Sequence, residues 1–250
     1  IIVECDKRLV SSLRKSFPDC DFRAETFDTV SFKCPEEDFD FHMPLADLGY
    51  FLEADIGIAA RLKPWFHIDQ VRASQWRKKI GSDQLTIGFC STSSVNGGRR
   101  DITYLDLEFF EGLIKASDHK WVFLDYALDE DELNRFSDQS RKKIFVPPCD
   151  RKNDFQTMAE IISTCDLVIG PCIAPMSLAN SVGVPTYTFY PGWGPLFALG
   201  VEPDANGEIT DPLQPRFSGI IIPPSDSKAL RYEKISKYFF DKIISYQEKL

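Results

Sequence analysis

The stretch that decides the fold class is DFQTMAEIISTCDLVIGPCIAPMSLANSVGVPTYTFYP, residues 154–191. Apolar residues recur at i, i+3, i+4 and i+7 from Phe155 onward, which predicts one buried face of a helix. Asp154 stands directly before them, where a carboxylate can accept hydrogen bonds from the first amides of a helix. The wholly apolar run 167–169 is typical of a strand covered on both faces. This half of the stretch therefore predicts a helix followed by a buried strand.

The second half of the stretch predicts another helix and another strand. Pro175 suits the first turn of a helix, because its missing N–H is not needed there. Gly183 is placed to end that helix, and residues 186–190 return to strand composition. The loop 171–175 therefore follows the carboxyl end of a parallel strand, which is where open α/β sheets bind ligands.

Free backbone amides at the start of this second helix form a candidate anion site. The N–H groups of a first helical turn have no partner within the helix, and the helix dipole adds positive potential there. An ordinary connecting turn with nothing bound is the alternative interpretation. The candidate donors for a diphosphate are the amides of Cys172, Ile173, Ala174, Met176 and Ser177.

Helices and strands alternate along most of the chain, which predicts an α/β fold with a parallel sheet and helices on both faces. The amino-terminal part holds too few strands for a doubly wound domain of its own. Strands are expected at 1–4, 21–24, 85–90, 120–124, 144–146 and 219–222, and helices near Leu9–Leu13 and at 42–52, 69–80, 106–116, 130–139 and from Ser225 to the C-terminus.

Composition excludes several classes of protein. A net charge of -9 argues against non-specific binding of nucleic acid, which needs a basic surface. No apolar run is long enough to span a membrane, and no signal peptide is visible. Seven cysteines without metal-like spacing indicate reduced thiols in a cytoplasmic protein. The chain opens on strand-like sequence without a methionine, so we expect an earlier part of the protein to be absent.

Several segments together carry a resemblance to a known family. The chain resembles the catalytic part of bacterial glycosyltransferases of the GT-B fold. The resemblance is stronger to those attached to tetratricopeptide repeats and weaker to the heptosyltransferases. The resemblance covers about residues 1–190, and no repeats are present. The segments are Val3–Leu9 through Ser16–Pro18, Met43–Leu48, Gln75–Arg77 with Leu85–Phe89, and Asp154–Ala159 with Asp166–Ile169, Leu178–Ala179 and Gly183–Pro185.

The resemblance implies two Rossmann-like domains. Residues 1–73 would be the partial acceptor-side domain and its linker, and residues 74–224 the domain that binds a nucleotide-diphosphate sugar. Residues 225–250 would form a helix packing back across both domains. The implied activity is transfer of the sugar to a glycan, lipid or protein acceptor. No cofactor or bound metal is expected, since no acidic Asp-x-Asp pair follows a suitable strand.

The resemblance also implies three roles at the donor diphosphate, and one of them falls to the amides around Ile173 to Ser177, which would hold it at the helix end. Ser91, Thr92 and Ser93 would face the phosphates, or they are only a flexible polar loop. Arg99 or Arg100 would set a guanidinium against them, as bidentate geometry favours, or they are a solvated basic pair. Relatives carry Asp-Thr-Gly and a later His, whereas the aligned residues here are Cys172, Ile173, Ala174 and Ser177.

A candidate general base and a candidate nucleotide-base pocket remain, and each also has a purely structural interpretation. His42 is a candidate general base, although a lone histidine is more often structural. Pro147, Pro148 and Asp154 are candidates for the wall of a nucleotide-base pocket, or they form a rigid turn and a helix cap.

The alternative to an enzyme is a catalytically inactive module that keeps the fold to bind a nucleotide sugar or another protein. The altered residues at 172–174 and 177 favour it, whereas the retained Arg99 and Arg100 favour the enzyme. An unrelated doubly wound nucleotide binder lacks support, because no glycine-rich phosphate motif follows a strand.

Overall fold

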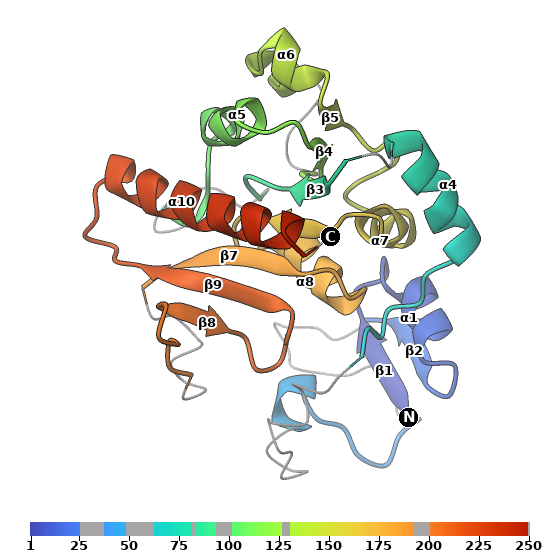
Figure 1. The fold of residues 1–250 in the computed structure, drawn as a ribbon. Coiled ribbons are helices and arrows are strands. Elements are labelled where there is room, and N and C mark those ends of the chain that lie inside the picture. The colour runs from blue at the N-terminus through green and yellow to red at the C-terminus, as the bar shows by residue number, and fades with distance from the viewer. Residues whose placement is uncertain are drawn as a thin grey trace.

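The computed structural model describes residues 1–25, 38–48, 63–81, 84–93, 102–126, 131–192 and 201–249. They form a large unit around a seven-stranded sheet and a small amino-terminal unit around two strands (Figure 1). The α/β class expected from the sequence is confirmed.

The large sheet has the order β5-β4-β3-β6-β7-β9-β8. Every neighbouring pair is parallel except β8 and β9, which run antiparallel at the edge. The parallel sheet was predicted, but the short edge strand β8 was not. The bounds are β3 Thr86–Phe89, β4 Lys120–Phe123, β5 Ile144–Phe145, β6 Leu167–Ile169, β7 Thr186–Pro191, β8 Glu208–Thr210 and β9 Phe217–Ile222.

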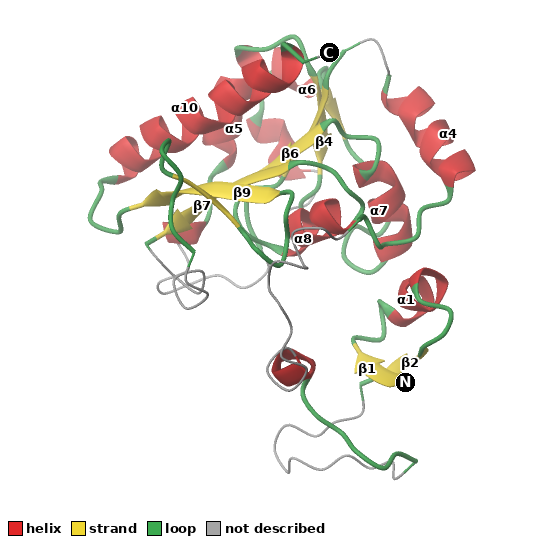
Figure 2. Cartoon of the chain, turned by 60° about the horizontal axis from the view of Figure 1, so that its bottom comes forward, coloured by secondary structure: helices red, strands yellow, loops and turns green. Residues whose placement is uncertain are grey.

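Helices cover both faces of this sheet, as Figure 2 shows. Side chains alternate along each strand, so Trp121 and Phe123 of β4 enter one apolar core and Val122 enters the other. Phe89 lies at the centre of the first core, with its ring centroid 5.0 Å from that of Phe110. One face carries α5 (Leu107–Lys115) and α10 (Lys228–Gln247), and the other carries α4 (Gln70–Ile80), α7 (Phe155–Ile162) and α8 (Ala174–Ser181).

The chain reverses direction across the sheet after β5. It adds β4 and β5 on one side of β3, and then crosses back to place β6 on the other side. The loops that follow β3 and β6 therefore leave the sheet toward opposite faces, into α5 and α8 respectively. Such a point opens a crevice at the carboxyl ends of the strands, and that crevice is where a ligand is expected.

The small unit is a strand–helix–strand segment followed by a short turn of helix. Its elements are β1 (Ile2–Cys5), α1 (Val10–Ser16), β2 (Asp21–Ala24) and η1 (Leu45–Asp47), and β1 and β2 pair in parallel. The connecting segment joins both units through the backbone: the His67 N–H donates to Ser16 Oγ at 2.9 Å, and the Trp65 N–H donates to the Ser181 carbonyl at 3.0 Å. Of the helix expected at 42–52, residues 45–48 are helical among the described residues, and 49–52 lie outside them.

The single helix expected at 130–139 is wrong. The chain instead forms a 3₁₀ helix, η3 (Asp131–Arg135), and a short helix, α6 (Asp138–Arg141). Ser137 separates them, because its hydroxyl accepts the Ser140 N–H and so begins a new helix. Leu133 and Phe136 are both buried three residues apart, a spacing that suits three residues per turn.

The last helix differs from expectation in three respects. It begins after Ser227, whose side chain caps it, rather than at Ser225. The apolar spacing of Leu230 with Ile235, Phe239 and Ile243 predicts that all four are buried, but Leu230 is 39% exposed. The helix packs on α5, β7 and β9 of the large unit instead of extending to the small one (Figure 1). Among the described helices none, α10 included, combines the length and the apolar character needed to cross a bilayer.

Candidate functional site

The first turn of α8 begins at the end of β6 and leaves backbone donors free. Ile173 has extended φ and ψ angles and no side-chain cap, and Pro175 occupies the first turn. Among the described residues, no acceptor is found for the backbone N–H groups of Cys172, Ile173 and Ala174. Cys172 and Ala174 are exposed, so these amides lie where a solvent-borne anion can reach them.

Met176 does not belong to this set of donors. Its N–H donates to the Ile173 carbonyl at 2.9 Å, and its side chain is fully buried. The structure thus corrects the expectation that the Met176 amide is free, because a 3₁₀-type bond closes the first turn. Ser177 is exposed on the same turn. Although Cys172 is exposed as a residue, its thiol is partly shielded from solvent, which raises the pKa of that thiol, so it is neutral at pH 7 and adds no negative charge here.

The approach of β6 to β3 fixes where this helix starts. Gly170 follows β6 with φ +154°, and a Cβ atom on it would lie 2.5 Å from the Cys90 carbonyl oxygen. No other residue fits that approach without moving the backbone of one strand. Gly183, with φ +92°, ends the helix as the sequence predicted.

Asp125, just after β4, organises the loop that follows β3. Its carboxylate accepts the Ser91 N–H and the Ser91 hydroxyl, both at 2.8 Å, and the Thr92 N–H at 3.2 Å. Asp125 and Ser91 are almost completely buried. Ser91 therefore points into the protein and anchors the loop, which corrects the expectation that it faces donor phosphates. Ser93 lies in the same loop, with its Oγ 3.1 Å from the Tyr126 hydroxyl.

The burial of Asp125 predicts a specific dependence of stability on pH. Burial raises the pKa of Asp125 to about 6, against 3.8 for an ordinary aspartate, and the hydrogen bonds from Ser91 and Thr92 oppose that rise. Between these two values the folded protein holds a proton that the unfolded chain has lost. The contribution of Asp125 to the free energy of unfolding is therefore full below pH 4 and falls as the pH rises to about 6. Urea unfolding from pH 4 to 7 should show this fall in the wild-type protein, and an Asp125→Asn variant should lack it.

A small cavity adjoins the start of α8 on the side of α7. Its volume is about 70 Å³, enough for one anionic group rather than a whole nucleotide. Ala174 and Pro175 form one wall, and three cationic side chains, Arg8, Arg151 and Lys152, form another. The Lys152 ammonium forms no ion pair within 4 Å among the described residues, although its charge helps to lower the pKa of Asp150. A helix start and three cations thus meet at one cavity.

Hydrogen bonds hold two of these cations in place. Arg151 donates from Nε to the Asp125 carbonyl, and its guanidinium lies 5.4 Å from the ring centroid of Phe123. Arg8 comes from the small unit, where Asp6 binds it at 2.9 and 2.7 Å. These hydrogen bonds from Arg8 lower the pKa of Asp6 to about 2, so the pair is charged at neutral pH.

Arg8 also connects the small unit to α7. Its Nη1 donates to the Lys152 carbonyl at 3.0 Å, and its guanidinium lies 5.3 Å from the ring centroid of Phe155. The wall of the cavity is therefore built from residues 144 positions apart in the chain.

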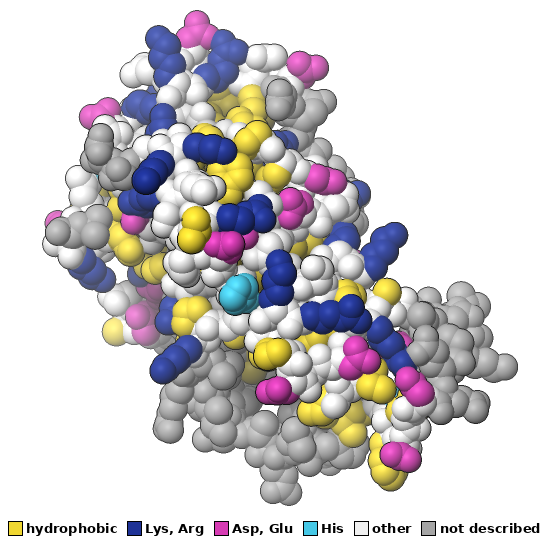
Figure 3. Space-filling view, turned by 90° about the vertical axis from the view of Figure 1, so that its right-hand side faces the viewer, with side chains coloured by type: hydrophobic (Ala, Val, Ile, Leu, Met, Phe, Trp, Pro, Cys, Tyr) yellow, Lys and Arg dark blue, Asp and Glu magenta, His cyan; other side chains and the backbone are white. Residues whose placement is uncertain are grey.

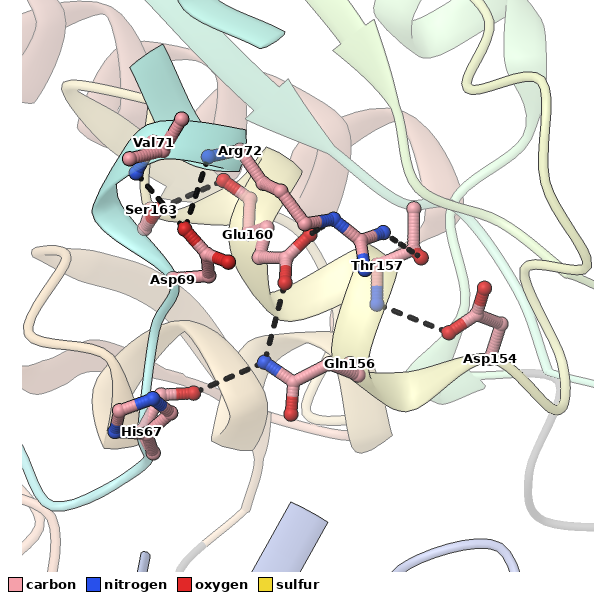
Figure 4. Close-up of polar contacts among 9 residues, drawn as sticks. All are labelled: His67, Asp69, Val71, Arg72, Asp154, Gln156, Thr157, Glu160 and Ser163. Atoms are coloured by element: carbon pink, nitrogen blue, oxygen red, sulfur yellow. Dashed lines mark hydrogen bonds and ion pairs between the residues drawn. The ribbon is translucent and has the colours of Figure 1, made fainter. Parts of the chain in front are cut away.

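A buried carboxylate fixes α7 against α4, as Figure 4 shows. The Glu160 side chain is 1% exposed and pairs with Arg72 Nε at 2.9 Å. The second guanidinium arm of Arg72 donates to Thr157 Oγ1 at 3.0 Å. Gln156 donates from Nε2 to the His67 carbonyl at 3.0 Å. These bonds hold α7, whose first turn borders the cavity.

A larger cavity lies on the other side of the same sheet edge. It has a volume of about 470 Å³ and is bounded by the loop after β3, the first turns of α5 and α10, and η3. Thr92 lines this cavity and Tyr126 lines the small one, so the adjacent loops after β3 and β4 separate the two.

The remaining candidates lie outside these cavities. His42 is exposed and contacts Phe39 edge-on, with a ring distance of 5.2 Å. Pro147 is buried and Pro148 exposed, and neither lines a cavity described here. Asp154 caps α7 by accepting the Thr157 N–H at 3.0 Å, as the sequence predicted. Arg99 and Arg100 lie outside the described residues.

Sequence reasoning missed Asp125, Arg8, Arg151 and Lys152. A signal existed for Asp125, because it directly follows an apolar strand, and for Arg151 and Lys152, which stand between a strand and a helix cap. Nothing local marked Arg8, since it reaches the cavity only through the contact between the units. Basic side chains also gather on the face that carries α4 and α1, despite the net charge of -9 (Figure 3).

Solved structures resemble this fold. The glycosyl transferase family 9 protein from Veillonella parvula DSM 2008 is 18% identical with a TM-score of 0.51, and the match covers 74% of this chain and 54% of that one. The E. coli ADP-heptose lps heptosyltransferase II is 14% identical with a TM-score of 0.48, over 76% of this chain and 55% of that one. No protein-family model matches the sequence, and neither does any curated protein.

This likeness shows the fold alone, a mixed α/β arrangement of the GT-B glycosyltransferase type. The chain spans about half the length of the solved proteins it matches. The fold expected from the sequence is thus confirmed, and the activity is a separate question.

Proposed function

We propose that this protein binds a nucleotide-diphosphate sugar at the start of α8 and transfers the sugar to an acceptor. The observation that carries the proposal is that the start of α8, with the free amide of Ala174 in the wall and those of Cys172 and Ile173 directly before it in the chain, meets the cations Arg151, Lys152 and Arg8 at one cavity. Amides and guanidinium groups are the donors that hold phosphate oxygens, and both are present at the strand ends where such folds bind nucleotides.

The proposed chemistry is displacement at the sugar carbon, with the nucleoside diphosphate as the leaving group. Negative charge then grows on the phosphate oxygen that departs. The fixed amides of 172–174 would stabilise that charge without reorganising, and Lys152 would neutralise part of it. The small cavity fits one phosphate group, so the nucleoside and the sugar would lie along the open edge of the sheet.

The second candidate function is a binding module without transferase activity. Two observations favour it. The side chains at the start of α8 are a neutral thiol, Cys172, and a hydroxyl, Ser177, where relatives carry acidic and imidazole groups. The exposed His42 has no hydrogen-bonded carboxylate among the described residues to orient it as a base.

Nucleotide binding is the first test. We expect UDP, GDP or ADP to raise the melting temperature and to bind in calorimetry. An Arg151→Ala, Lys152→Ala double variant should bind about tenfold or more weakly, because it loses two charge-assisted contacts. A Lys78→Ala, Lys142→Ala variant removes two exposed lysines elsewhere and serves as the control for charge.

The outcomes separate the two candidates. Binding that the double variant weakens, together with release of the nucleoside diphosphate from a nucleotide sugar, supports the transferase. The same binding without release supports the inactive module. An Arg99→Ala, Arg100→Ala variant tests the basic pair that the family resemblance implies. The absence of any nucleoside diphosphate binding would contradict both.

A further inference from the structure

The larger cavity at the sheet edge has features of a second ligand site. Its volume of about 470 Å³ lies in the range of small-molecule sites. Its apolar lining includes Leu105 and Leu107, each 3% exposed, and its rim carries Arg135, Lys228 and Arg231. No residue lines both this cavity and the one beside α8.

Two of the three cations at the rim are already paired. Lys228 Nζ lies 2.7 Å from the Asp106 carboxylate, and Arg135 forms an ion pair with Glu108. Arg231 is different: it is half-buried, and no described residue forms a side-chain hydrogen bond or ion pair with it. The cavity therefore presents one guanidinium whose charge is not compensated.

The wall around this guanidinium is held in a defined geometry. The Asp106 N–H donates to the Tyr232 hydroxyl at 3.2 Å, which ties the first turn of α10 to the start of α5. Lys228 Nζ lies 5.1 Å from the centroid of the Tyr232 ring, a cation–π contact. Lys228 and Arg231 stand three residues apart on one helix, so their side chains share a face.

We propose that this cavity binds a sugar that carries a phosphate or carboxylate group, with Arg231 as the partner of the anionic group. A guanidinium offers two parallel donors to such a group. The carboxylates of Asp106 and Glu132 can accept sugar hydroxyls, and the rings of Tyr104 and Tyr232 offer apolar surface to a sugar face. This proposal does not depend on the activity proposed for the site at α8.

Calorimetry with glucose 6-phosphate and with inorganic phosphate tests the proposal on the full chain. We expect the wild-type protein to bind glucose 6-phosphate more tightly than phosphate. An Arg231→Gln variant should bind it about tenfold or more weakly, since the charged pair is lost. Lys237→Gln, which removes an exposed charge further along α10, should bind like the wild-type protein. Thermal melting confirms that each variant is folded, and Arg231→Lys should retain part of the affinity.

The Arg151→Ala, Lys152→Ala variant distinguishes the two sites. It should bind glucose 6-phosphate normally while losing nucleoside diphosphate. Three results would overturn the proposal: no binding of either probe at millimolar concentration, unchanged binding by Arg231→Gln, or loss of binding in the Arg151→Ala, Lys152→Ala variant. The last result would place the anion at α8 instead.

Discussion

An Asp125→Ala variant is expected to lose about 4 kcal/mol of its free energy of unfolding at pH 7. The substitution leaves the amides of Ser91 and Thr92 and the hydroxyl of Ser91 without their acceptor in a buried place. An orphaned buried donor costs about 1–3 kcal/mol, and part of that cost is recovered as the loop after β3 relaxes. Chemical denaturation followed by circular dichroism measures the loss.

Asp118→Ala is the matched control for this variant. Its side chain is 99% exposed and lies 3.5 Å from Lys143, so the change should alter stability by less than about 0.5 kcal/mol. Because Asp125 also anchors Arg151 through its carbonyl, nucleotide binding should survive in molecules that remain folded. If Asp125→Ala and Asp118→Ala had the same free energy of unfolding, the Ser91 and Thr92 donors would have found other acceptors.

Local pattern was sufficient to predict the elements that build the site. The helix after Asp154, the buried strand 167–169 and the glycine stop at Gly183 all appear as expected. Each depends on signals within a few residues: a cap, an apolar period, a residue that tolerates positive φ. The parallel sheet was expected for a similar reason, since alternating helices and strands favour it, but the order of its strands was not predicted from the sequence.

The contacts that complete the site depend on distant residues, and no local signal predicted them. Asp125 and Ser91 are 34 positions apart, and Arg8 and Lys152 are 144 apart. Sequence pattern showed polar residues in the loop 91–93 but not which of them face inward. Ser91 was assigned to the donor phosphates for that reason, although its hydroxyl serves the buried carboxylate.

The prediction of a single helix at 130–139 was also wrong because local sequence pattern did not determine the structure. The apolar spacing of Leu133 and Phe136 fits both an α-helix and a 3₁₀ helix, and Ser137 then decides by capping a second helix. The edge strand β8, residues 208–210, was not predicted, because three residues are too few to show the alternation of apolar and polar side chains that marks a strand. Short elements of this kind are selected by packing rather than by their own sequence.

The two units meet at the candidate site, so the small unit would contribute to the binding proposed above. Arg8 is held by Asp6 at one end of its guanidinium and by the Lys152 carbonyl at the other. Any shift between the units would move this cation relative to the start of α8. The bonds that oppose such a shift run from the small unit through the connecting segment to α7, and Arg72 of α4 holds α7 in turn.

An Arg72→Ala variant tests this connection. It removes the partner of a carboxylate that is 1% exposed, so Glu160 is left charged and desolvated. Breaking a fully buried pair costs about 3–5 kcal/mol. Arg72 itself is 47% exposed and water can enter the vacated space, so we expect a loss of about 2 kcal/mol. Glu160→Gln keeps the shape and removes the charge, and it should cost less than about 1 kcal/mol.

The way the free energy of unfolding changes with pH tests whether the charge left on Glu160 causes the loss of stability in Arg72→Ala. Burial raises the pKa of Glu160, and removing Arg72 takes away a charge that opposes this rise. The carboxyl of the Arg72→Ala variant should therefore take up a proton in the folded state as the pH falls, and its deficit in unfolding free energy should shrink toward pH 4. Glu160→Gln has no carboxyl at this position, so it lacks the extra stability that the raised pKa of Glu160 gives the wild-type protein at low pH, and its deficit should grow rather than shrink toward pH 4. A deficit in Arg72→Ala that does not change with pH would mean that lost packing between α4 and α7, and not the stranded charge, accounts for the effect.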